Sequence, residues 1–161
     1  MKKIPENPFG YDTTEDNTGF LLWQVSSMWQ QIQEKALRAN FGLSQSQYVV
    51  LASTYWLNVL DREITQINLA QHTKIDKMTV SKILKILEDK SLIYRKPHST
   101  DSRANAVYLT QEGKDLMSKA IDIIETIDKE FFLSFGKKID KLNHILLKLI
   151  ETNKNLFFQS F

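Results

Sequence analysis

The chain has 161 residues, of which 42% are hydrophobic and 25% charged, and its formal net charge is +2. This composition is ordinary for a soluble globular protein of one domain, and no apolar run approaches the roughly 18 residues that a membrane span needs. The first residues lack the apolar core and cleavage site of a secretory signal, and the absence of cysteine excludes disulfides and thiol redox switches. We therefore expect a cytoplasmic protein that has no membrane partner.

The distribution of charge is more informative than its total. Between Asp76 and Arg103 there are seven basic and four acidic residues, a surplus of +3, so the rest of the chain carries −1. Such a concentration of positive charge is typical of a segment that binds nucleic acid. The surplus is small, and a solvated lysine-rich surface would also produce it.

The N-terminal part of the chain is expected to form an extended arm followed by a long helix. Residues 1–13 hold two of the three prolines and show no periodicity, and residues 15–39 follow with a helical pattern. An apolar stripe along this helix is formed by Leu21, Val25, Met28 and Ile32. Phe20, Trp23 and Trp29 lie off the stripe, so a second side of the helix also needs a packing partner.

A capping box opens the next helix, which is predicted over residues 45–57. Ser44 stands three residues before Gln47, so each side chain can bond the other residue's amide. After this helix, Glu63 and Ile64 are predicted to form a minimal strand, and Thr65 is placed to cap a further helix.

Two short helices, predicted over 66–72 and 77–89, are separated by a tight polar turn, and Asp76 is a suitable N-cap for the second. The core face of the second helix is formed by Val80, Ile83, Leu84 and Leu87. Short polar and basic residues occupy its other side: Lys77, Ser81, Lys82 and Lys85. This pattern fits a helix that enters the DNA major groove, although surface helices commonly carry lysines.

Two β-prone runs follow, at 93–95 and 106–109, joined by a long polar loop over 96–105. Arg103 in this loop is suited to a narrow minor groove, and Asp101 is placed to hold its guanidinium. A helix-turn-helix followed by a hairpin with a basic loop is the layout of a winged helix-turn-helix.

Two long helices are predicted to close the chain, over 111–135 and 138–158, with a break at Gly136. Both carry wide apolar surfaces that one small lobe does not cover. The surplus predicts a subunit interface.

With these elements in order, the sequence resembles the MarR family of bacterial transcriptional regulators from about Gly19 to Leu156. The resemblance rests on Leu69-Ala70, on the run from Asp76 to Lys82, on the run from Leu87 to Arg95, and above all on Asp101-Ser-Arg103 followed by Leu109-Thr110 and Gly113. One position departs: Ser91 stands where the family often has glycine after the recognition helix, and we expect this helix to end by another geometry.

The resemblance implies a fold that is mainly α with a small β-hairpin, in one domain spanning 1–161. A winged helix-turn-helix lobe (44–110) is inserted between dimerisation helices (14–42 and 111–158). The implied function is sequence-specific binding of double-stranded DNA by a homodimer that represses transcription at a pseudo-palindromic operator. The alternative is a winged-helix protein-interaction module that binds no DNA.

Carried onto this sequence, the family pattern implies base-edge and phosphate contacts by the recognition helix, insertion of Arg103 into the minor groove, and phosphate contacts by Gln66 and Asn68. Arg95 has a structural role or contacts phosphate in this reading. The full set of predicted DNA-binding residues is Gln66, Asn68, Lys77, Thr79, Ser81, Lys82, Lys85, Arg95, Lys96, Ser99 and Arg103.

No catalytic constellation is visible, and His72, His98 and His144 are scattered, so we expect no enzyme, no cofactor and no metal site. Family members commonly bind a small aromatic effector at the junction of the lobe and the dimerisation helices. Candidate residues for such a pocket are Trp23, Trp29, Tyr48, Tyr55 and Trp56. Core and interface packing is the alternative role for these aromatics, and His72 is a candidate polar contact there.

Overall fold

The computed structural model describes residue 10, residues 13–60 and residues 63–158, with side chains up to 156. Most of the expected N-terminal arm lies outside the described residues. The helices are α1 (Thr18–Phe41), α2 (Gln45–Val59), α3 (Gln66–Thr73), α4 (Lys77–Asp89), α5 (Gln111–Phe131) and α6 (Ile139–Phe158). The strands are β1 (Ile64–Thr65), β2 (Ile93–Pro97) and β3 (Asn105–Leu109), and short 3-10 turns cover Thr14–Asp16 and Leu133–Lys138.

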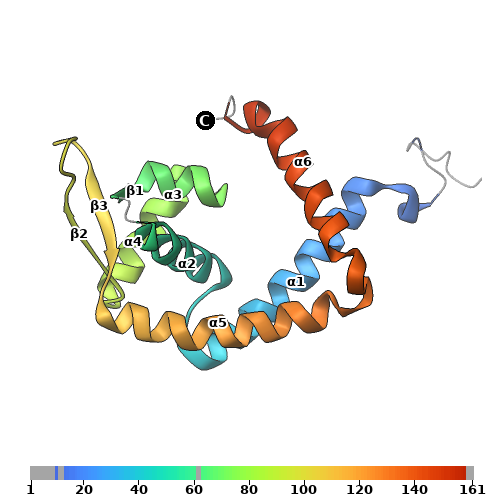
Figure 1. Cartoon of the computed structure of the whole chain (residues 1–161), viewed down its shortest axis with the longest axis horizontal. Helices are drawn as coiled ribbons and strands as arrows, with labels where there is room; N and C mark the ends of the chain where they lie inside the picture. Colours follow the sequence, from blue (N-terminus) through green and yellow to red (C-terminus); the bar gives the residue numbers. More distant parts are fainter. Residues whose placement is uncertain (1–9, 11–12, 61–62, 159–161) are drawn as a thin grey trace, which may run out of the picture.

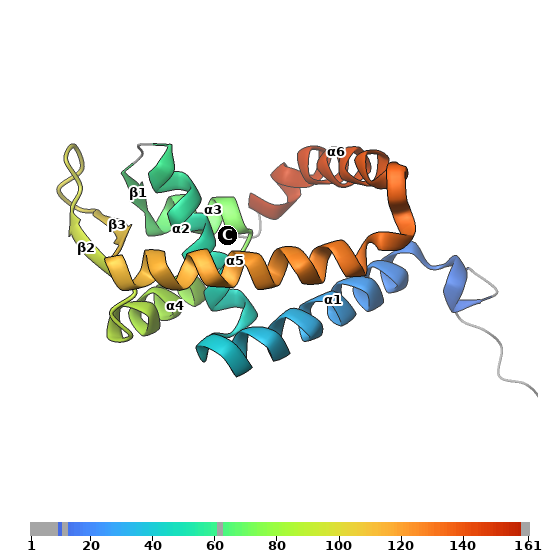
Figure 2. The same ribbon diagram turned by 60° about the horizontal axis from the view of Figure 1, so that its bottom comes forward.

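The molecule is elongated, with a lobe at one end and long helices extending away from it (Figures 1 and 2). The lobe contains α2, α3, α4 and the three strands. Helix α5 leaves the lobe and runs beside α1 in both views, and α6 turns back from the far end of α5. The expected fold class, mainly helical with a small sheet, is confirmed.

The sheet is antiparallel with the strand order β1-β3-β2. Five residue pairs join β2 to β3, from Ile93 opposite Leu109 to Pro97 opposite Asn105. Strand β1 adds to the other edge of β3, with Ile64 opposite Val107. The predicted hairpin is therefore part of a three-stranded sheet, and its loop is shorter than expected because both strands extend toward it.

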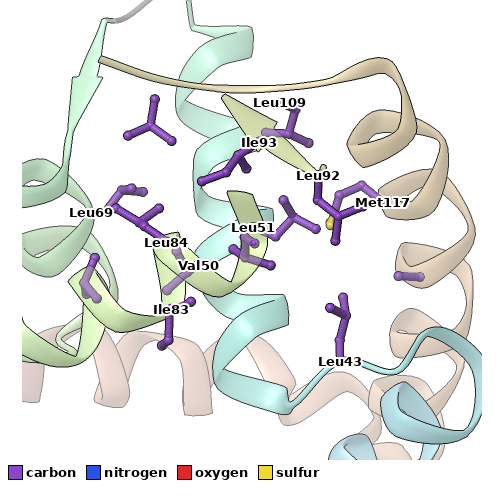
Figure 3. Packing of buried hydrophobic residues seen from close by; sticks show 14 of the residues in the cluster. Leu43, Val50, Leu51, Leu69, Ile83, Leu84, Leu92, Ile93, Leu109 and Met117 are labelled. Carbon is purple, nitrogen blue, oxygen red and sulfur yellow. The ribbon is translucent and has the colours of Figure 1, made fainter. Parts of the chain in front are cut away.

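One hydrophobic core lies in the lobe and continues along the first half of α5 (Figure 3). Leu51 of α2, Leu84 of α4 and Ile93 of β2 are essentially inaccessible to solvent. Met117 and Ala120 of α5 and Leu37 of α1 extend this core toward the long helices. Among the residues described, α6 contributes none to the core, which leaves most of its apolar residues exposed.

Helix boundaries differ from the sequence expectation where a side chain or a backbone angle intervenes. Helix α1 begins at Thr18 rather than near residue 15, because the Asn17 side chain accepts the Phe20 amide at 2.9 Å. The helix continues to Phe41 and ends at Gly42, whose φ of 62° is left-handed. Helix α5 ends at Phe131, four residues early, and a 3-10 turn containing Gly136 carries the chain into α6.

The expectation for Ser91 was wrong. Ser91 has a φ of 58°, so serine adopts the left-handed conformation that glycine favours, and the helix end keeps its usual geometry. The amides of Ser91 and Leu92 bond to the carbonyls of Glu88 and Leu87, at 2.9 Å each. The Ser91 carbonyl in turn accepts the Thr110 hydroxyl at 2.7 Å. These bonds offset the cost of a left-handed residue that is not glycine.

Candidate nucleic-acid interface

The turn between α3 and α4 is closed by short-range hydrogen bonds. Lys74 is left-handed with a φ of 60°, and its amide donates to the Ala70 carbonyl at 3.0 Å. Asp76 then caps α4 by accepting the Thr79 amide at 2.9 Å. Hydrogen bonds from Thr79 hold the pKa of the Asp76 carboxyl below its ordinary value, because they stabilise the charged form.

Helix α4 presents two opposite surfaces, as the sequence predicted. Its core residues Val80, Ile83, Leu84 and Leu87 are buried. The other side of the helix carries Lys77, Lys82 and Lys85, which are exposed, and Ser81, which is half-buried. Thr79 is also exposed. The helix therefore offers hydroxyl and ammonium groups to a partner, which are groups that hydrogen-bond base edges and phosphates.

Two predicted phosphate ligands, Gln66 and Asn68, have structural contacts at the start of α3. The side-chain Nε2 of Gln66 donates to the Lys77 carbonyl at 3.0 Å, which ties α3 to α4. The side-chain Oδ1 of Asn68 accepts the Thr65 backbone amide at 2.9 Å as one half of a capping box. Their contact with DNA remains a prediction, in which each has to use its other polar groups.

The wing loop, residues 98–104, presents Arg103 to solvent. The Arg103 side chain is 91% exposed, and its Nε lies 3.4 Å from Asp101 Oδ1. The same carboxylate oxygen accepts the Arg103 amide at 3.0 Å. The predicted pairing of Asp101 with Arg103 is confirmed. The position of the guanidinium therefore depends on the conformation of the loop, because its ion pair is with a residue of that loop.

Unlike Arg103, the basic residues Arg95 and Lys96 of strand β2 contact residues outside the wing loop. Arg95 is half-buried, and its Nε lies 3.3 Å from Glu88 Oε2, which joins β2 to α4. Lys96 lies over the Tyr94 ring, with its Nζ 5.3 Å from the ring centroid. Lys77, Arg95 and Arg103 line one groove of about 270 Å³ between the helices and the wing. Three cations in one groove favour an anionic partner.

Glu63 is a residue of this region that sequence reasoning missed. Its carboxylate accepts both the amide of Ser99, at 3.2 Å, and the Ser99 hydroxyl. It also accepts the Tyr108 hydroxyl at 3.2 Å and lies 3.8 Å from His98 Nε2. The Ser99 bonds above all, with Tyr108 and His98 adding to them, lower the pKa of Glu63. Ser99, a predicted DNA ligand, is exposed, but its amide and hydroxyl are hydrogen-bonded to Glu63.

The five candidate effector residues do not form one cluster. Trp29 donates from Nε1 to Asp128 Oδ1 at 2.8 Å, at the contact of α1 with α5. Tyr48 is half-buried, and burial, Asp128 and Glu125 raise its pKa. Trp23 and Trp56 are exposed, and Tyr55 is half-buried beside the core. Only Trp29 and Tyr48 thus share an environment, around Asp128.

His72 is exposed and lines a different space, an open cavity of about 1000 Å³ between α3, the wing loop and α6. Across the described part of the chain, no group of three or more His, Cys, Asp or Glu side chains is arranged to hold a metal ion. The helices within this part include none with the length and apolarity to cross a membrane.

The chain resembles MepR of S. aureus, solved in complex with DNA, with a TM-score of 0.76 and 22% identity over 87% of this chain and 99% of MepR. At this level of identity, the resemblance establishes the fold.

Sequence comparison identifies the family. A MarR family profile matches residues 43–104. The chain is 37% identical over 120 residues to the uncharacterized HTH-type transcriptional regulator YdcH of Bacillus subtilis, covering 74% of this chain and 81% of YdcH. It is 30% identical over 147 residues to the organic hydroperoxide resistance transcriptional regulator of the same bacterium, covering 91% and 96%. The protein is therefore a regulator rather than an enzyme, and it belongs to the MarR family of transcriptional regulators.

Proposed function

We propose that this regulator is a homodimeric repressor that binds a pseudo-palindromic operator in the cytoplasm. In each protomer α4 enters the major groove, and the wing loop places Arg103 in the adjacent minor groove. The observation that carries the proposal is the basic outer side of α4 beside a groove lined by Lys77, Arg95 and Arg103. A dimer reads two half-sites when its recognition helices lie about 34–36 Å apart.

The DNA contacts divide by chemistry. Lys77, Lys82, Lys85 and Lys96 supply charge to phosphates, which contributes affinity with little sequence preference. Thr79 and Ser81 are short enough to hydrogen-bond base edges from the start of α4. Gln66, Asn68 and Ser99 flank these contacts in the proposal, and Arg95 acts mainly by joining the hairpin to α4.

A titration with DNA tests this proposal. The purified protein is titrated with the DNA upstream of its own gene and with a scrambled duplex, at salt concentrations from roughly 50 to 200 mM. We expect selective binding with a steep salt dependence, and we expect Arg103→Ala to weaken operator binding by about tenfold, the cost of one specific contact. Equal and weak binding to both duplexes, confirmed by a genome-wide selection that recovers no site, contradicts the proposal.

The specific rival is a winged-helix protein-interaction module. Charge reversal separates the two functions, because Arg103→Glu and Lys82→Glu reverse the attraction to phosphates. We expect both variants to lose operator binding. Regulation that survives both changes supports the rival.

We also propose that a small aromatic effector acts at the junction of the lobe with α1 and α5, near Trp29 and Tyr48. Its two supports are the aromatic side chains and the half-buried polar group around Asp128. The effector changes the separation of the two α4 helices, and with it the fit to successive major grooves. Equal operator affinity and equal lobe separation with and without ligand contradict this mechanism.

A further inference from the structure

Glu63 joins the wing loop to the rest of the lobe. Its carboxylate bonds the amide and hydroxyl of Ser99 and lies beside His98, both of which belong to the loop. The same carboxylate accepts the Tyr108 hydroxyl from the central strand. Within the described part of the chain, Glu63 is the one residue outside the β2–β3 hairpin that hydrogen-bonds this loop. We call Glu63 with Ser99, His98 and Tyr108 the wing clamp.

The remaining hydrogen bonds of the wing loop are internal to it. The His98 amide donates to the Ala104 carbonyl at 3.1 Å, and the Ala104 amide donates to the Asp101 carbonyl at 3.0 Å. His98 Nδ1 accepts the amides of Thr100 and Asp101, at 3.3 Å each. These bonds give the loop its shape, but none of them joins it to the lobe outside the hairpin. The wing clamp supplies that connection, through Glu63 next to β1.

The orientation of the loop matters because Arg103 has no other support. Its side chain is almost fully exposed, and its ion pair is with Asp101 of the same loop. A long, exposed side chain loses rotational freedom when it binds. If the backbone that carries it is already held in place, less conformational entropy is lost on binding. A rotation of the loop therefore moves Arg103 without breaking any contact that Arg103 makes.

The wing clamp acts from the side of the hairpin that faces away from the basic groove. Side chains alternate across a strand, so Tyr94 and Tyr108, which pair across β2 and β3, share one face of the hairpin. Arg95 and Val107 share the other face, and both line the basic groove. Glu63 therefore lies outside the groove lined by Lys77, Arg95 and Arg103, and its contacts are with the wing.

The wing clamp also extends across the sheet to a second cation. Tyr108 stacks on Tyr94 with ring centroids 5.5 Å apart, and Lys96 lies over the Tyr94 ring. A contact path thus runs from Glu63 on the β1 side to Lys96 on β2. Loosening Glu63 removes one hydrogen-bond partner of Tyr108, the residue at the centre of this path.

We propose that Glu63 is a positioning residue for DNA binding, which holds the wing loop so that Arg103 reaches the minor groove. This inference rests on the proposed function. The inference predicts a change in DNA affinity, on removal of the Glu63 charge, that is opposite in sign to the change expected from electrostatics alone. Removing an acidic charge from a DNA-binding lobe favours association with phosphates, whereas loss of the wing clamp weakens it.

The test uses Glu63→Gln, which keeps the size of the side chain and removes its charge. The matched control is Glu112→Gln, the same change at an exposed position in the first turn of α5. We expect Glu63→Gln to weaken operator binding by about tenfold, comparable to loss of one specific contact. We expect the control to bind as well as the parent or slightly better.

A double-mutant cycle with Arg103→Ala distinguishes positioning from general damage. If Glu63 acts through Arg103, Glu63→Gln has no further effect once Arg103 is removed. Tyr108→Phe, which deletes one hydroxyl, gives a smaller loss that also disappears in the Arg103→Ala background. Hydrogen exchange of the Ser99 amide in the free protein adds a readout independent of DNA, and we expect it to accelerate in Glu63→Gln.

Three results overturn the proposal. The first is Glu63→Gln binding the operator as tightly as the control, or more tightly. The second is an equal loss in the presence and absence of Arg103, which assigns Glu63 a purely structural role. The third is a parent protein that selects no DNA at all, which defeats the proposed function as well. Only this last result involves the parent, so failure of the inference and failure of the function are distinguishable.

Discussion

Single side chains fix the ends of the elements that form the interface, and Asp76 is the clearest case. It caps α4, the proposed recognition helix, and its pKa is lowered by Thr79. A carboxyl with a lowered folded pKa binds protons more weakly when folded than when unfolded. Its stabilising effect is therefore present above the ordinary pKa of 3.8 and is lost as the pH falls through the folded value.

The variant Asp76→Asn isolates this effect, because asparagine is also a good N-cap but carries no charge. We expect urea unfolding at pH 7 to show the parent as more stable than Asp76→Asn, and the difference to shrink toward pH 3. Asp76→Ala, which removes the acceptor as well, is less stable than either at pH 7. A parent advantage of the same size at pH 3 and pH 7 contradicts this account.

At the scale of elements, the hairpin and α5 are joined by a close backbone approach at Gly113. A Cβ atom built on Gly113 lies 2.1 Å from the Leu92 carbonyl oxygen. Backbone cannot move aside as a flexible side chain can, so any other residue here pushes α5 away from Leu92, the residue before β2. Gly113 is part of the motif shared with the family, and in this chain its lack of a side chain allows α5 to pack against the Leu92 backbone.

We expect Gly113→Ala to destabilise the protein by about 1–3 kcal/mol, the usual cost of overpacking. Gly19→Ala in the first turn of α1 is the matched control, because its added Cβ finds ordinary contact at 3.4 Å from Asn17 Oδ1. Urea midpoints of the two variants measure the contrast. Equal midpoints would show that the approach of α5 to Leu92 relaxes without cost.

How well each element could be predicted depends on how local its determinants are. The bounds of α4 were predicted to the residue, because its N-cap, Asp76, and its apolar spacing are both local in sequence. The start of α1 was missed because Glu15 and Asp16 suit a helix, whereas the Asn17 side chain forms the cap and α1 begins three residues later than expected, at Thr18. Ser91 was missed because the left-handed position after a helix favours glycine, whereas here local helix-end bonds and one bond from the distant Thr110 hydroxyl accompany a left-handed serine.

The same distinction applies to the site. The pairing of Asp101 with Arg103 spans two residues and was predicted. Glu63 contacts Ser99 and Tyr108, which are 36 and 45 residues away, and no periodicity or motif marks such a contact. The aromatic candidates were chosen by residue type, and their positions depend on how α1 and α5 pack, which one sequence does not reveal.

At the scale of the whole molecule, the apolar residues outside the core decide what the protein assembles with. Trp23, Val25 and Met28 of α1 are exposed, Trp23 by 64%. On α6, the exposed apolar residues are Ile145, Leu146, Leu147, Leu149, Ile150 and Leu156. Exposed apolar side chains along two long helices constitute a surface that soluble monomers rarely leave open. The proposed homodimer, formed through the terminal helices, covers it.

The test of the dimer compares two methionines that are both exposed but lie on different surfaces. Met28 is on α1, 59% exposed, and Met78 is on α4, 71% exposed. We expect the parent to sediment at twice its mass of 18.8 kDa, with a thermal midpoint that rises with protein concentration. Met28→Asp buries a charge in the interface, so it shifts the protein toward monomer, whereas Met78→Asp remains dimeric.

A parent that sediments as a monomer at high micromolar concentration, or an equal shift in both variants, contradicts an interface on α1. If Met28→Asp also loses operator binding, pairing of the two half-sites depends on the same surface.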